Sequence, residues 1–350
     1  MKKVKVGNIF LGGGESIKIQ SMTNISAKNL SACINQIQDL EKAGCEIVRI
    51  AIPDEENAKA VSVLKEKTKV PLVADIHFDY RLALMCIERG IDKVRINPGN
   101  IGSEENIKKV AQAAKQKNIP IRIGINGGSL EKHLLEKYKS PCAEAMIESA
   151  KGQIEILNKY DFNDVVLSLK SSDVKKTIEA YRLARETFDC PLHLGVTEAG
   201  TYTQGLVKSA IGIGSLLADG IGDTIRVSLT DDPVKEVYAA KEILKALRLG
   251  APSVEVVSCP TCARCRINLI EIAKRVNERV ADIPCSLKVA VMGCAVNGPG
   301  EAKDADIGIA GGDKCAILFK KGEIVAKFKE DEIENVLIEE IKKITNCERN

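Results

Sequence analysis

Closely spaced cysteines near the carboxyl end of the chain are the residues best suited to binding a soft metal. One motif, S-C-P-T-C-A-R-C, opens the stretch 258–301, and another, M-G-C-A-V-N-G-P-G-E, closes it. A C-x2-C turn lets two sulfurs reach one metal without strain, and a further ligand can arrive from a distant segment. The cysteines of the two motifs are Cys259, Cys262, Cys265 and Cys294, and the second motif ends on Glu301. The stretch therefore predicts a metal or cluster site.

The spacing of these cysteines does not decide between an iron–sulfur cluster and a structural zinc ion. Four thiolates from the two motifs would satisfy either of them. The chain has twelve cysteines in 350 residues. Because it is long and carries no recognisable export signal, metal binding and buried thiols are favoured over disulfides. The dispersed cysteines are interpreted as packing residues: Cys33, Cys45, Cys86, Cys142, Cys190, Cys315 and Cys347.

A second chemical pattern is a set of cations, one on each of five apolar segments. These are Arg49, Arg95, Arg122, Lys170 and Arg226. Other polar residues occur nearby on the same or similar segments: Asp75, His77, Asn97, Asn126, Glu198 and Ser228. Cations gathered without partners would repel one another and lose hydration. An anion with about two charges removes that difficulty, and arginine suits phosphate oxygens well. We therefore expect a phosphate or diphosphate ester as ligand, although single arginines could instead pair with carboxylates on the exterior.

The elements that must position these side chains alternate between strand and helix patterns. Eight apolar, β-branched runs are predicted strands, at 17–24, 46–53, 71–78, 93–100, 119–127, 164–172, 191–200 and 224–233. Amphipathic stretches such as 30–43, 57–67, 81–88 and 104–117 are predicted helices. This alternation in about 230 residues favours an α/β fold, a (β/α)8 TIM barrel over 1–248, with chemistry at the carboxyl ends of its strands. An open doubly wound sheet is the alternative, but no G-x-G-x-x-G turn follows the first strand.

A second, smaller α+β domain is expected over 254–350, after a turn-rich linker. Its predicted elements are strands at 254–258 and 287–292, a hairpin of 307–319 and 323–328, and helices at 267–280 and 332–344. Before the barrel, the triplet Gly12-Gly13-Gly14 lacks the Lys-Ser/Thr that would complete a phosphate loop. It is interpreted as a tight turn in a short hairpin that closes the barrel floor.

Composition excludes several other classes of protein. Aromatic residues make up 3% of the chain and tryptophan is absent, so stacking platforms for single-stranded nucleic acid are not expected. The net charge of +3 does not by itself indicate a nucleic-acid partner. No apolar run of about 18 residues predicts a membrane span, and no hydrophobic signal region follows the basic first residues. We expect a cytoplasmic protein.

The motifs that carry these residues resemble one family over nearly the whole chain. They are, in order, I-Q-S-M-T-N, A-D-I-H-F, V-R-I-N-P-G-N-I-G, R-I-G-I-N-G-G-S-L, L-S-L-K-S-S, L-G-V-T-E-A-G, G-I-G-D-T-I-R-V-S-L-T, S-C-P-T-C-A-R and M-G-C-A-V-N-G-P-G-E. They resemble the 4-hydroxy-3-methylbut-2-enyl diphosphate synthase (GcpE) family in its bacterial two-domain form. The resemblance implies an oxidoreductase of the methylerythritol phosphate route to isoprenoids.

The activity implied by the resemblance is the reductive ring opening and dehydration of 2-C-methyl-D-erythritol 2,4-cyclodiphosphate. It consumes two electrons, delivered through a 4Fe–4S cluster from ferredoxin or flavodoxin. The implied cluster ligands are Cys259, Cys262, Cys294 and Glu301. The implied substrate contacts are Arg49, Arg95, Arg122, Asn126, Lys170, Arg226 and Ser228, with Asp75, His77, Asn97 and Thr197 nearby. Glu198 matches the catalytic acid, and we hypothesise that substrate displaces Glu301, a weaker oxygen ligand.

Cys265 is the one departure from the family's ligand pattern. By spacing alone it could join Cys259, Cys262 and Cys294 in an all-thiolate set, so its role stays open at this point. The resemblance also implies a homodimer in which the cluster domain of one chain caps the barrel of the other, because the cluster must reach a substrate bound at a barrel mouth.

Overall fold

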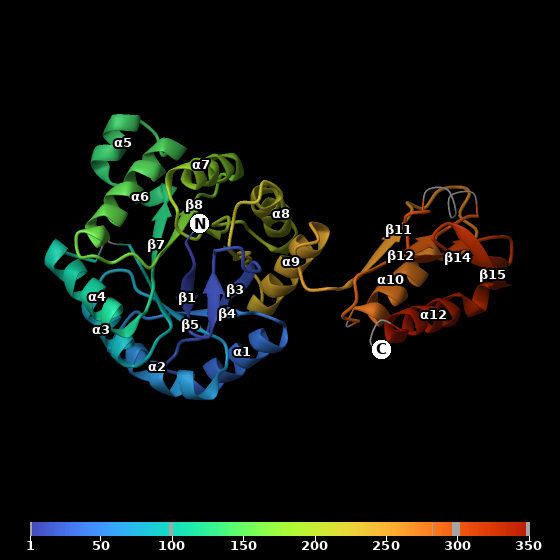
Figure 1. Ribbon diagram of the computed structural model, residues 1–350, viewed down its shortest axis with the longest axis horizontal. Helices are drawn as coiled ribbons and strands as arrows, with labels where there is room; N and C mark the ends of the chain where they lie inside the picture. The colour runs from blue at the N-terminus through green and yellow to red at the C-terminus, as the bar shows by residue number, and fades with distance from the viewer. Residues whose placement is uncertain (1, 98–100, 282, 296–301, 348–350) are drawn as a thin grey trace. The chain divides into compact units, whose positions relative to one another are not determined.

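The fold is that of a computed structural model, which describes residues 2–97, 101–281, 283–295 and 302–347. The chain divides into two compact units, Met1–Leu249 and Gly250–Asn350. Figure 1 shows the first in blue to yellow and the second in orange to red. Each unit is described by itself below.

The first unit is a closed barrel of parallel strands. Its strands are β3 (Lys18–Met22), β4 (Ile47–Ala51), β5 (Leu72–Asp75), β6 (Lys93–Ile96), β7 (Ile121–Asn126), β8 (Val165–Lys170), β9 (His193–Leu194) and β10 (Thr224–Ile225). Strands β3 to β8 pair in chain order, and β10 pairs with β9 on one side and with β3 on the other. A parallel bridge between Leu167 and Leu192 joins β8 to β9. The predicted TIM barrel is confirmed, although β9 and β10 are much shorter than predicted because their polar ends belong to the loops.

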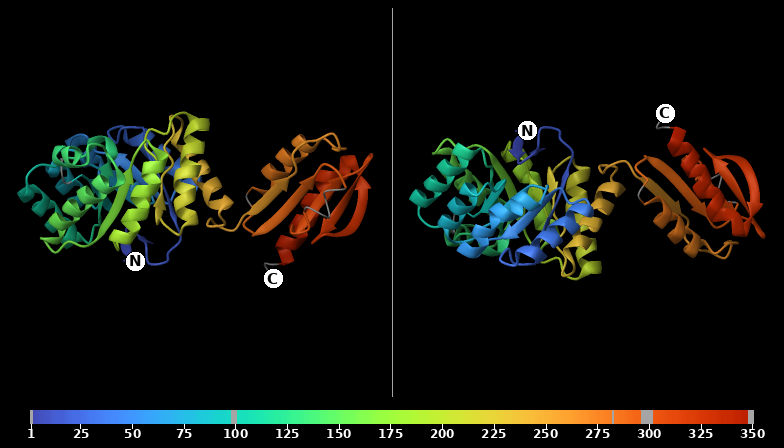
Figure 2. Two further views of the ribbon diagram at one scale, coloured as in Figure 1. Left: turned by 90° about the horizontal axis from the view of Figure 1, so that it is seen from above. Right: turned by 90° about the horizontal axis from the view of Figure 1, so that it is seen from below.

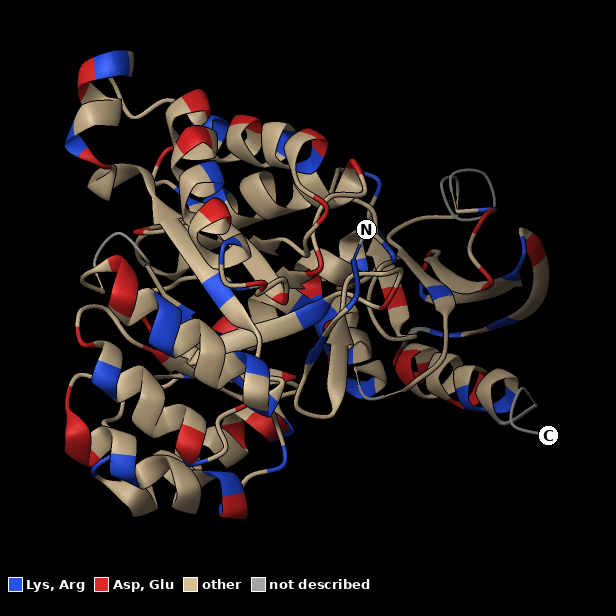
Figure 3. Cartoon of the chain, turned by 60° about the vertical axis from the view of Figure 1, so that its left-hand side comes forward, with Lys and Arg blue, Asp and Glu red and all other residues tan. Residues whose placement is uncertain are grey.

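Helices surround the barrel strands in Figure 1, and Figure 2 shows the same helices from above and below. These helices are α1 (Leu30–Lys42), α2 (Glu55–Lys67), α3 (Tyr80–Glu88), α4 (Glu104–Lys117), α6 (Ala143–Asn158), α7 (Val174–Thr187), α8 (Tyr202–Ala218) and α9 (Pro233–Ala246). Aspartate caps begin several of them; Asp54, for example, accepts from the amide of Asn57. A short extra helix, α5 (Lys132–Tyr138), packs on α6. In Figure 3, both signs of charge are mixed over the outer helices, which is typical of a solvated face.

A two-stranded hairpin closes the floor of the barrel. It consists of β1 (Val4–Val6) and β2 (Ile9–Leu11). Its buried side chains Val4, Val6 and Leu11 cluster with one apolar residue each from β4, β5 and β8. The hairpin was predicted, but its turn lies at 7–8 instead of in the glycine triplet. Gly12 follows β2 with a left-handed φ of 76°, where a Cβ atom would meet the Lys2 carbonyl at 2.3 Å.

The interior of the barrel is unusually polar. On β5, Leu72 and Ala74 belong to the outward core beneath the helices, whereas Val73 packs on the floor hairpin and therefore points inward. The same alternation on the other strands turns a row of polar residues inward, because side chains of a strand face opposite sides in turn. Buried polar residues that point inward include Gln20, Asp75, Lys93, Arg122, Ser168, His193 and Thr224. Barrel interiors are usually filled by valine, isoleucine and leucine.

In the part of the second unit that the structure describes, a five-stranded mixed sheet packs with the helices α10 (Leu269–Val280) and α12 (Ile333–Cys347). The strands of the sheet are β11 (Val254–Ser258), β12 (Leu287–Met292), β13 (Ile307–Gly311), β14 (Cys315–Lys320) and β15 (Glu323–Lys329). The first three strands are parallel and the last two antiparallel. The sheet confirms the predicted α+β architecture. The run 307–319 was predicted as one arm of a hairpin, but it forms two strands, because 312–314 make a turn in which Lys314 is left-handed at φ 53°.

Candidate active site

The carboxyl ends of the barrel strands surround a polar cavity of about 170 Å³. All five cations that the sequence singled out line it: Arg49, Arg95, Arg122, Lys170 and Arg226. Asp75, His77, Asn126 and Thr197 line it as well. Parallel strands in a barrel bring their carboxyl ends to one mouth, so residues as distant in sequence as Arg49 and Arg226 meet there. The structure therefore brings the five predicted cations together at the mouth of the barrel.

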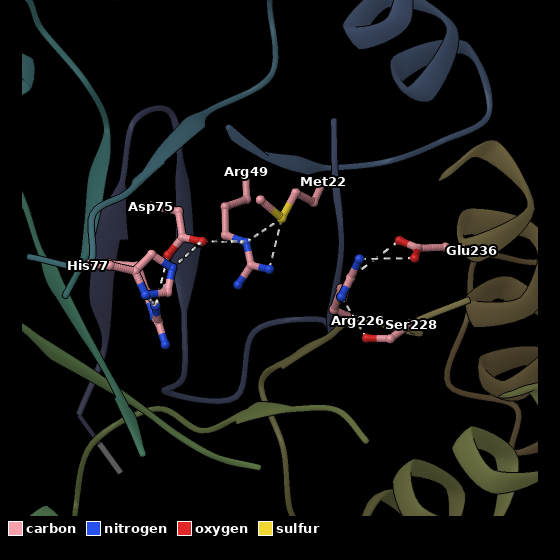
Figure 4. A network of polar contacts seen from close by, with 8 residues as sticks. Met22, Arg49, Asp75, His77, Arg226, Ser228 and Glu236 are labelled. Atoms are coloured by element: carbon pink, nitrogen blue, oxygen red, sulfur yellow. Dashed lines mark hydrogen bonds and ion pairs between the residues drawn. The ribbon is translucent and has the colours of Figure 1, made fainter. Parts of the chain in front are cut away.

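Asp75 is the carboxylate at the centre of this mouth. It accepts a hydrogen bond from Arg95 Nη1 at 3.0 Å, and Arg49 Nε lies 3.8 Å from its other oxygen. His77 Nε2 lies 3.4 Å from Asp75 Oδ2 (Figure 4). Burial raises the pKa of Asp75, but the charge of Arg49, followed by the hydrogen bond from His77, outweighs it and holds the pKa well below its ordinary value. Asp75 is thus an ionised group that orients two of the arginines.

Arg226 is held by a carboxylate that sequence reasoning missed. Glu236, in the first turn of α9 and 3% exposed, accepts from Arg226 Nη2 at 3.0 Å and from Nε at 3.2 Å. It also accepts from the Ser21 hydroxyl at 2.8 Å and from the amide of Leu229 at 3.0 Å. The remaining nitrogen, Nη1, donates to the Ser228 hydroxyl at 2.6 Å (Figure 4). The only sequence signal was an acidic residue on the inner face of an amphipathic helix.

Glu236→Gln is expected to lower stability by about 2 kcal/mol, because an amide leaves the partly buried Arg226 charge without a counter-ion. That corresponds to a melting temperature lower by about 4–8 °C for a unit of this size. A loss of about tenfold in kcat/KM should accompany it, since Arg226 is no longer fixed. Calorimetry and steady-state kinetics measure the two effects. Glu242→Gln, an exposed change on the same helix, is the matched control; equal effects of the two changes would contradict this role for Glu236.

The other cations of the mouth have fewer protein partners. Arg122 is 1% exposed, and its Nε and Nη1 have no hydrogen-bond partner among the described residues. Burial, with the charges of Arg49 and Arg122 next, lowers the pKa of Lys170 well below its ordinary range. Burial also lowers the pKa of Arg49 to about 10. Arg49 donates from Nε and Nη2 to the Met22 sulfur at 3.0 and 2.9 Å, a weak acceptor for a guanidinium.

Some of the predicted site residues near the rim line the cavity and others do not. Thr197 lines the cavity, and Glu198, the next residue, is exposed and does not. Glu198 has a left-handed backbone with φ 51°, which is uncommon for a residue with a side chain. Asn126 accepts from the amide of Gly128 at 3.0 Å, so its amide nitrogen stays available toward the cavity. Asn97 is buried at 8% exposure just beyond β6.

The charge balance of the mouth indicates the kind of ligand it binds. Five cationic side chains face it, and Asp75 is the carboxylate among its described lining residues. Such an excess of positive charge at low exposure is costly unless an anion neutralises it. Arginine forks and a lysine around one small cavity suit phosphate oxygens. The mouth is therefore an anion site.

The cysteine motifs meet at one cavity of about 260 Å³ in the second unit. It lies at the carboxyl ends of β11 and β12 and is lined by Cys259, Cys262, Cys265 and Cys294, together with Pro260, Arg264 and Gly293. The two loops are tied together, since the amide of Gly293 donates to the Cys259 sulfur at 3.3 Å and the amide of Arg266 donates to the Gly293 carbonyl at 2.8 Å. Thiols from both motifs thus line one space, which is the donor set that a soft metal centre needs.

The thiols are not equivalent in this cavity. Cys262 is exposed and Cys294 is 6% exposed. The Cys265 thiol instead donates to the Ile267 carbonyl at 3.2 Å. Across the described residues, no three Cys, His, Asp or Glu side chains are already set as a group of metal ligands. The predicted ligand Glu301 lies outside the described residues.

Fold and site together define a class: a TIM barrel with an anion-binding mouth, followed by a small cysteine-rich domain. The chain belongs to the GcpE family, since the model of the GcpE TIM-barrel domain matches residues 1–241 and that of the GcpE protein C-terminal domain matches residues 255–343. This confirms the resemblance read from the sequence motifs. No helix among the described residues has the length and apolar character to cross a membrane.

Curated relatives are similar over almost the full chain. A protein of Fusobacterium nucleatum named 4-hydroxy-3-methylbut-2-en-1-yl diphosphate synthase (flavodoxin) is 58% identical, covering 97% of this chain and 95% of that protein. A protein of the same name from Clostridium tetani is 55% identical, covering 98% of each. Among solved structures, spsE of Bacillus subtilis, a spore coat polysaccharide biosynthesis protein, has a TM-score of 0.51 at 11% identity, covering 71% of this chain and 73% of that one. That likeness concerns the fold alone.

Proposed function

We propose that this chain reductively opens the ring of 2-C-methyl-D-erythritol 2,4-cyclodiphosphate and releases 4-hydroxy-3-methylbut-2-enyl diphosphate. The observation that carries the proposal is the convergence of five cations on one cavity at the barrel mouth. The name shared by the near full-length relatives points to the same product. The cyclic diphosphate carries two charges and the linear product three. The reaction therefore takes two electrons and one proton and releases one water.

In this proposal the mouth binds the diphosphate and stabilises the charge created by ring opening. Phosphate oxygens are contacted by the five cations that line the cavity, Arg49, Arg95, Arg122, Lys170 and Arg226. Asn126, Ser228, His77 and Thr197 supply hydrogen bonds, and Asp75 orients Arg49 and Arg95. Asn97 supports the β6 end of the site. Fixed cations in a water-poor cavity need no reorganisation when the bridging oxygen leaves, which favours the transition state.

Glu198 is proposed as the group that supplies the proton to the departing hydroxyl. Its carboxyl follows Thr197 at the rim of the cavity. A carboxylic acid in that position can donate to a leaving oxygen and recover its proton from solvent. In this proposal the exposed carboxyl of Glu198 exchanges its proton with water and reaches the ligand from the rim.

The cysteine cavity fits a 4Fe–4S cluster by its donor set. We propose Cys259, Cys262 and Cys294 as thiolate ligands and Glu301 as an oxygen ligand. When bound, such a cluster supplies electrons at low potential and a Lewis-acidic iron. Flavodoxin is the proposed electron donor, as the relatives' name suggests. A homodimer in which the cluster domain of one chain caps the barrel of its partner belongs to the same proposal, and so does a cytoplasmic location.

Anaerobic purification and assay test this function. We expect a brown protein with broad absorption near roughly 400 nm that converts the cyclodiphosphate when reduced flavodoxin is present. Oxidised flavodoxin is the control and should give no product. A colourless zinc protein that turns the cyclodiphosphate over without a reductant would instead support a redox-inert lyase and overturn the proposal.

A further inference from the structure

The barrel interior contains buried polar side chains with atoms that lack a described partner, and apart from Arg122 the proposed reaction does not use these side chains. Five residues are at most 2% exposed and have side-chain atoms without a hydrogen-bond partner among the described residues: Gln20, Lys93, Arg122, Ser168 and His193. Buried polar groups in native proteins are nearly always paired, so such a cluster calls for an explanation. Lys93 carries the largest electrostatic cost of the five, because an unpaired ammonium is the hardest of these groups to bury.

Lys93 lies at the lower end of β6, fully enclosed. Its register partner on β5 is Val73, which packs on the floor hairpin. The apolar hairpin therefore separates this level of the barrel from solvent below. The neighbouring carboxylate, Asp92, is occupied elsewhere: it binds Lys65 of α2 at 2.5 Å and accepts from the amide of Leu72 at 2.7 Å. The one acid next to Lys93 in sequence thus does not pair with it.

The charged groups that face Lys93 from the surrounding strands are mostly cationic. Arg122 on β7 and Arg49 on β4 act on it most strongly, and His193 on β9 lies within its electrostatic reach. Asp75 on β5, the carboxylate that lines the mouth, is engaged by Arg95 at 3.0 Å and by Arg49 at 3.8 Å. A charged Lys93 in the free protein would therefore be buried among like charges.

A neutral amine removes this conflict. Burial first, then the charge of Arg122, lowers the pKa of Lys93 well below its ordinary range, against a smaller opposite effect of Asp92. A neutral amine also has a lone pair that can accept a hydrogen bond, whereas an ammonium next to Arg122 offers only donors. The geometry of the empty mouth thus favours the uncharged form.

We propose that Lys93 is a buried proton acceptor beneath the substrate site: it is neutral when the mouth is empty and becomes an ammonium when a diphosphate occupies the mouth. The inference rests on the proposed function for the identity of that ligand. An anion among Arg49 and Arg122 cancels the repulsion that these two exert on Lys93. The ammonium then offsets part of the third negative charge that ring opening creates. Lys93 contacts no reacting atom in this account, so it is a positioning residue.

Proton uptake on binding tests the proposal. Each phosphorus of the cyclodiphosphate has one ionisable oxygen, and both are strongly acidic, so the ligand itself exchanges no proton near neutral pH. Titration calorimetry of the full chain in buffers of different ionisation enthalpy, between pH 7 and 9, counts the protons taken up by the protein. Lys93→Met is expected to take up about one proton fewer per site than the wild type. Lys115→Met, at an exposed position on α4, should match the wild type.

The pH dependence of affinity gives a second readout. Because binding takes up a proton, raising the pH weakens it. This effect is expected between the pKa of Lys93 in the free protein and its pKa in the complex. In that range each pH unit should raise the wild-type Kd by up to tenfold more than it raises the Kd of Lys93→Met. Lys93→Gln keeps a polar side chain and serves if the methionine variant does not fold. Equal proton uptake by the wild type and a folded variant overturns the proposal. Failure of the cyclodiphosphate to bind the wild type would instead count against the proposed function.

Discussion

Glu198→Gln is expected to reduce turnover by about 100- to 10,000-fold, the range for loss of a general acid. An amide has nearly the same shape as the carboxyl but cannot donate a proton to a departing hydroxyl. The absorption spectrum of the loaded protein should not change, because Glu198 is not a proposed cluster ligand and the cysteines proposed as ligands all lie in the second unit. The affinity for the cyclodiphosphate should stay equal or increase, since glutamine places no negative charge at the rim of an anion site.

The backbone of Glu198 supports this expectation. A left-handed conformation at a residue with a side chain costs roughly 1–2 kcal/mol, and Glu198 adopts it at φ 51°. Such a conformation persists where the surroundings hold it, and here the amides of Thr197 and Thr230 donate to the carbonyls of Ser171 and Gly200 on either side. The loop therefore fixes where the carboxyl is presented.

A matched control separates a catalytic effect from a general effect of charge. Glu186→Gln removes an exposed carboxylate from α7, away from the mouth, and should leave turnover unchanged. Single-turnover kinetics and equilibrium binding distinguish a slower chemical step from weaker binding. Turnover of Glu198→Gln within threefold of the wild type would exclude Glu198 as the proton donor.

The sequence predicted the mouth well because one geometric rule governs it. Once eight parallel strands are recognised, their carboxyl ends must meet, so Arg49 and Arg226 could be placed together without knowing any contact. Glu236 could not be found in this way. It lies on α9 and contacts Arg226 and Ser21 of the barrel strands and loops. These contacts depend on how the helix packs, which strand periodicity does not predict.

The polar interior was also beyond sequence reasoning. Lys93 and His193 each occur in a strand pattern, where an inward and an outward side chain differ by a single residue of register. His193 is packed in the interior, and its Nδ1 lies 2.6 Å from the Thr224 hydroxyl. Lys93 was not singled out, because an isolated lysine at a strand end usually points to solvent. The structure is needed to see that the floor hairpin separates the Lys93 side chain from solvent.

The cysteine loops illustrate a different limit. Spacing showed that two loops could supply one centre, and the structure places four thiols around one cavity. Spacing could not show which of these thiols donates a hydrogen bond to the protein backbone. That depends on the loop backbone, which directs Cys265 toward the Ile267 carbonyl at 3.2 Å. An ideal Cβ on Gly293 would lie 2.6 Å from the Cys265 sulfur, so this thiol is packed closely against the second loop.

Cys294→Ser is therefore expected to abolish cluster binding, and Cys265→Ser to preserve it. Serine is a poor ligand for cluster iron, so loss of a thiolate at 294 should leave well under half of the wild-type iron and lower turnover by more than about 1000-fold, since electrons no longer reach the substrate. At 265 a serine hydroxyl can still donate to the Ile267 carbonyl. Iron and sulfide analysis with electron paramagnetic resonance of the reduced protein measures both variants. If Cys265→Ser loses its iron while Glu301→Ala keeps it, the centre is an all-thiolate one, and the assignment of Glu301 as a ligand is wrong.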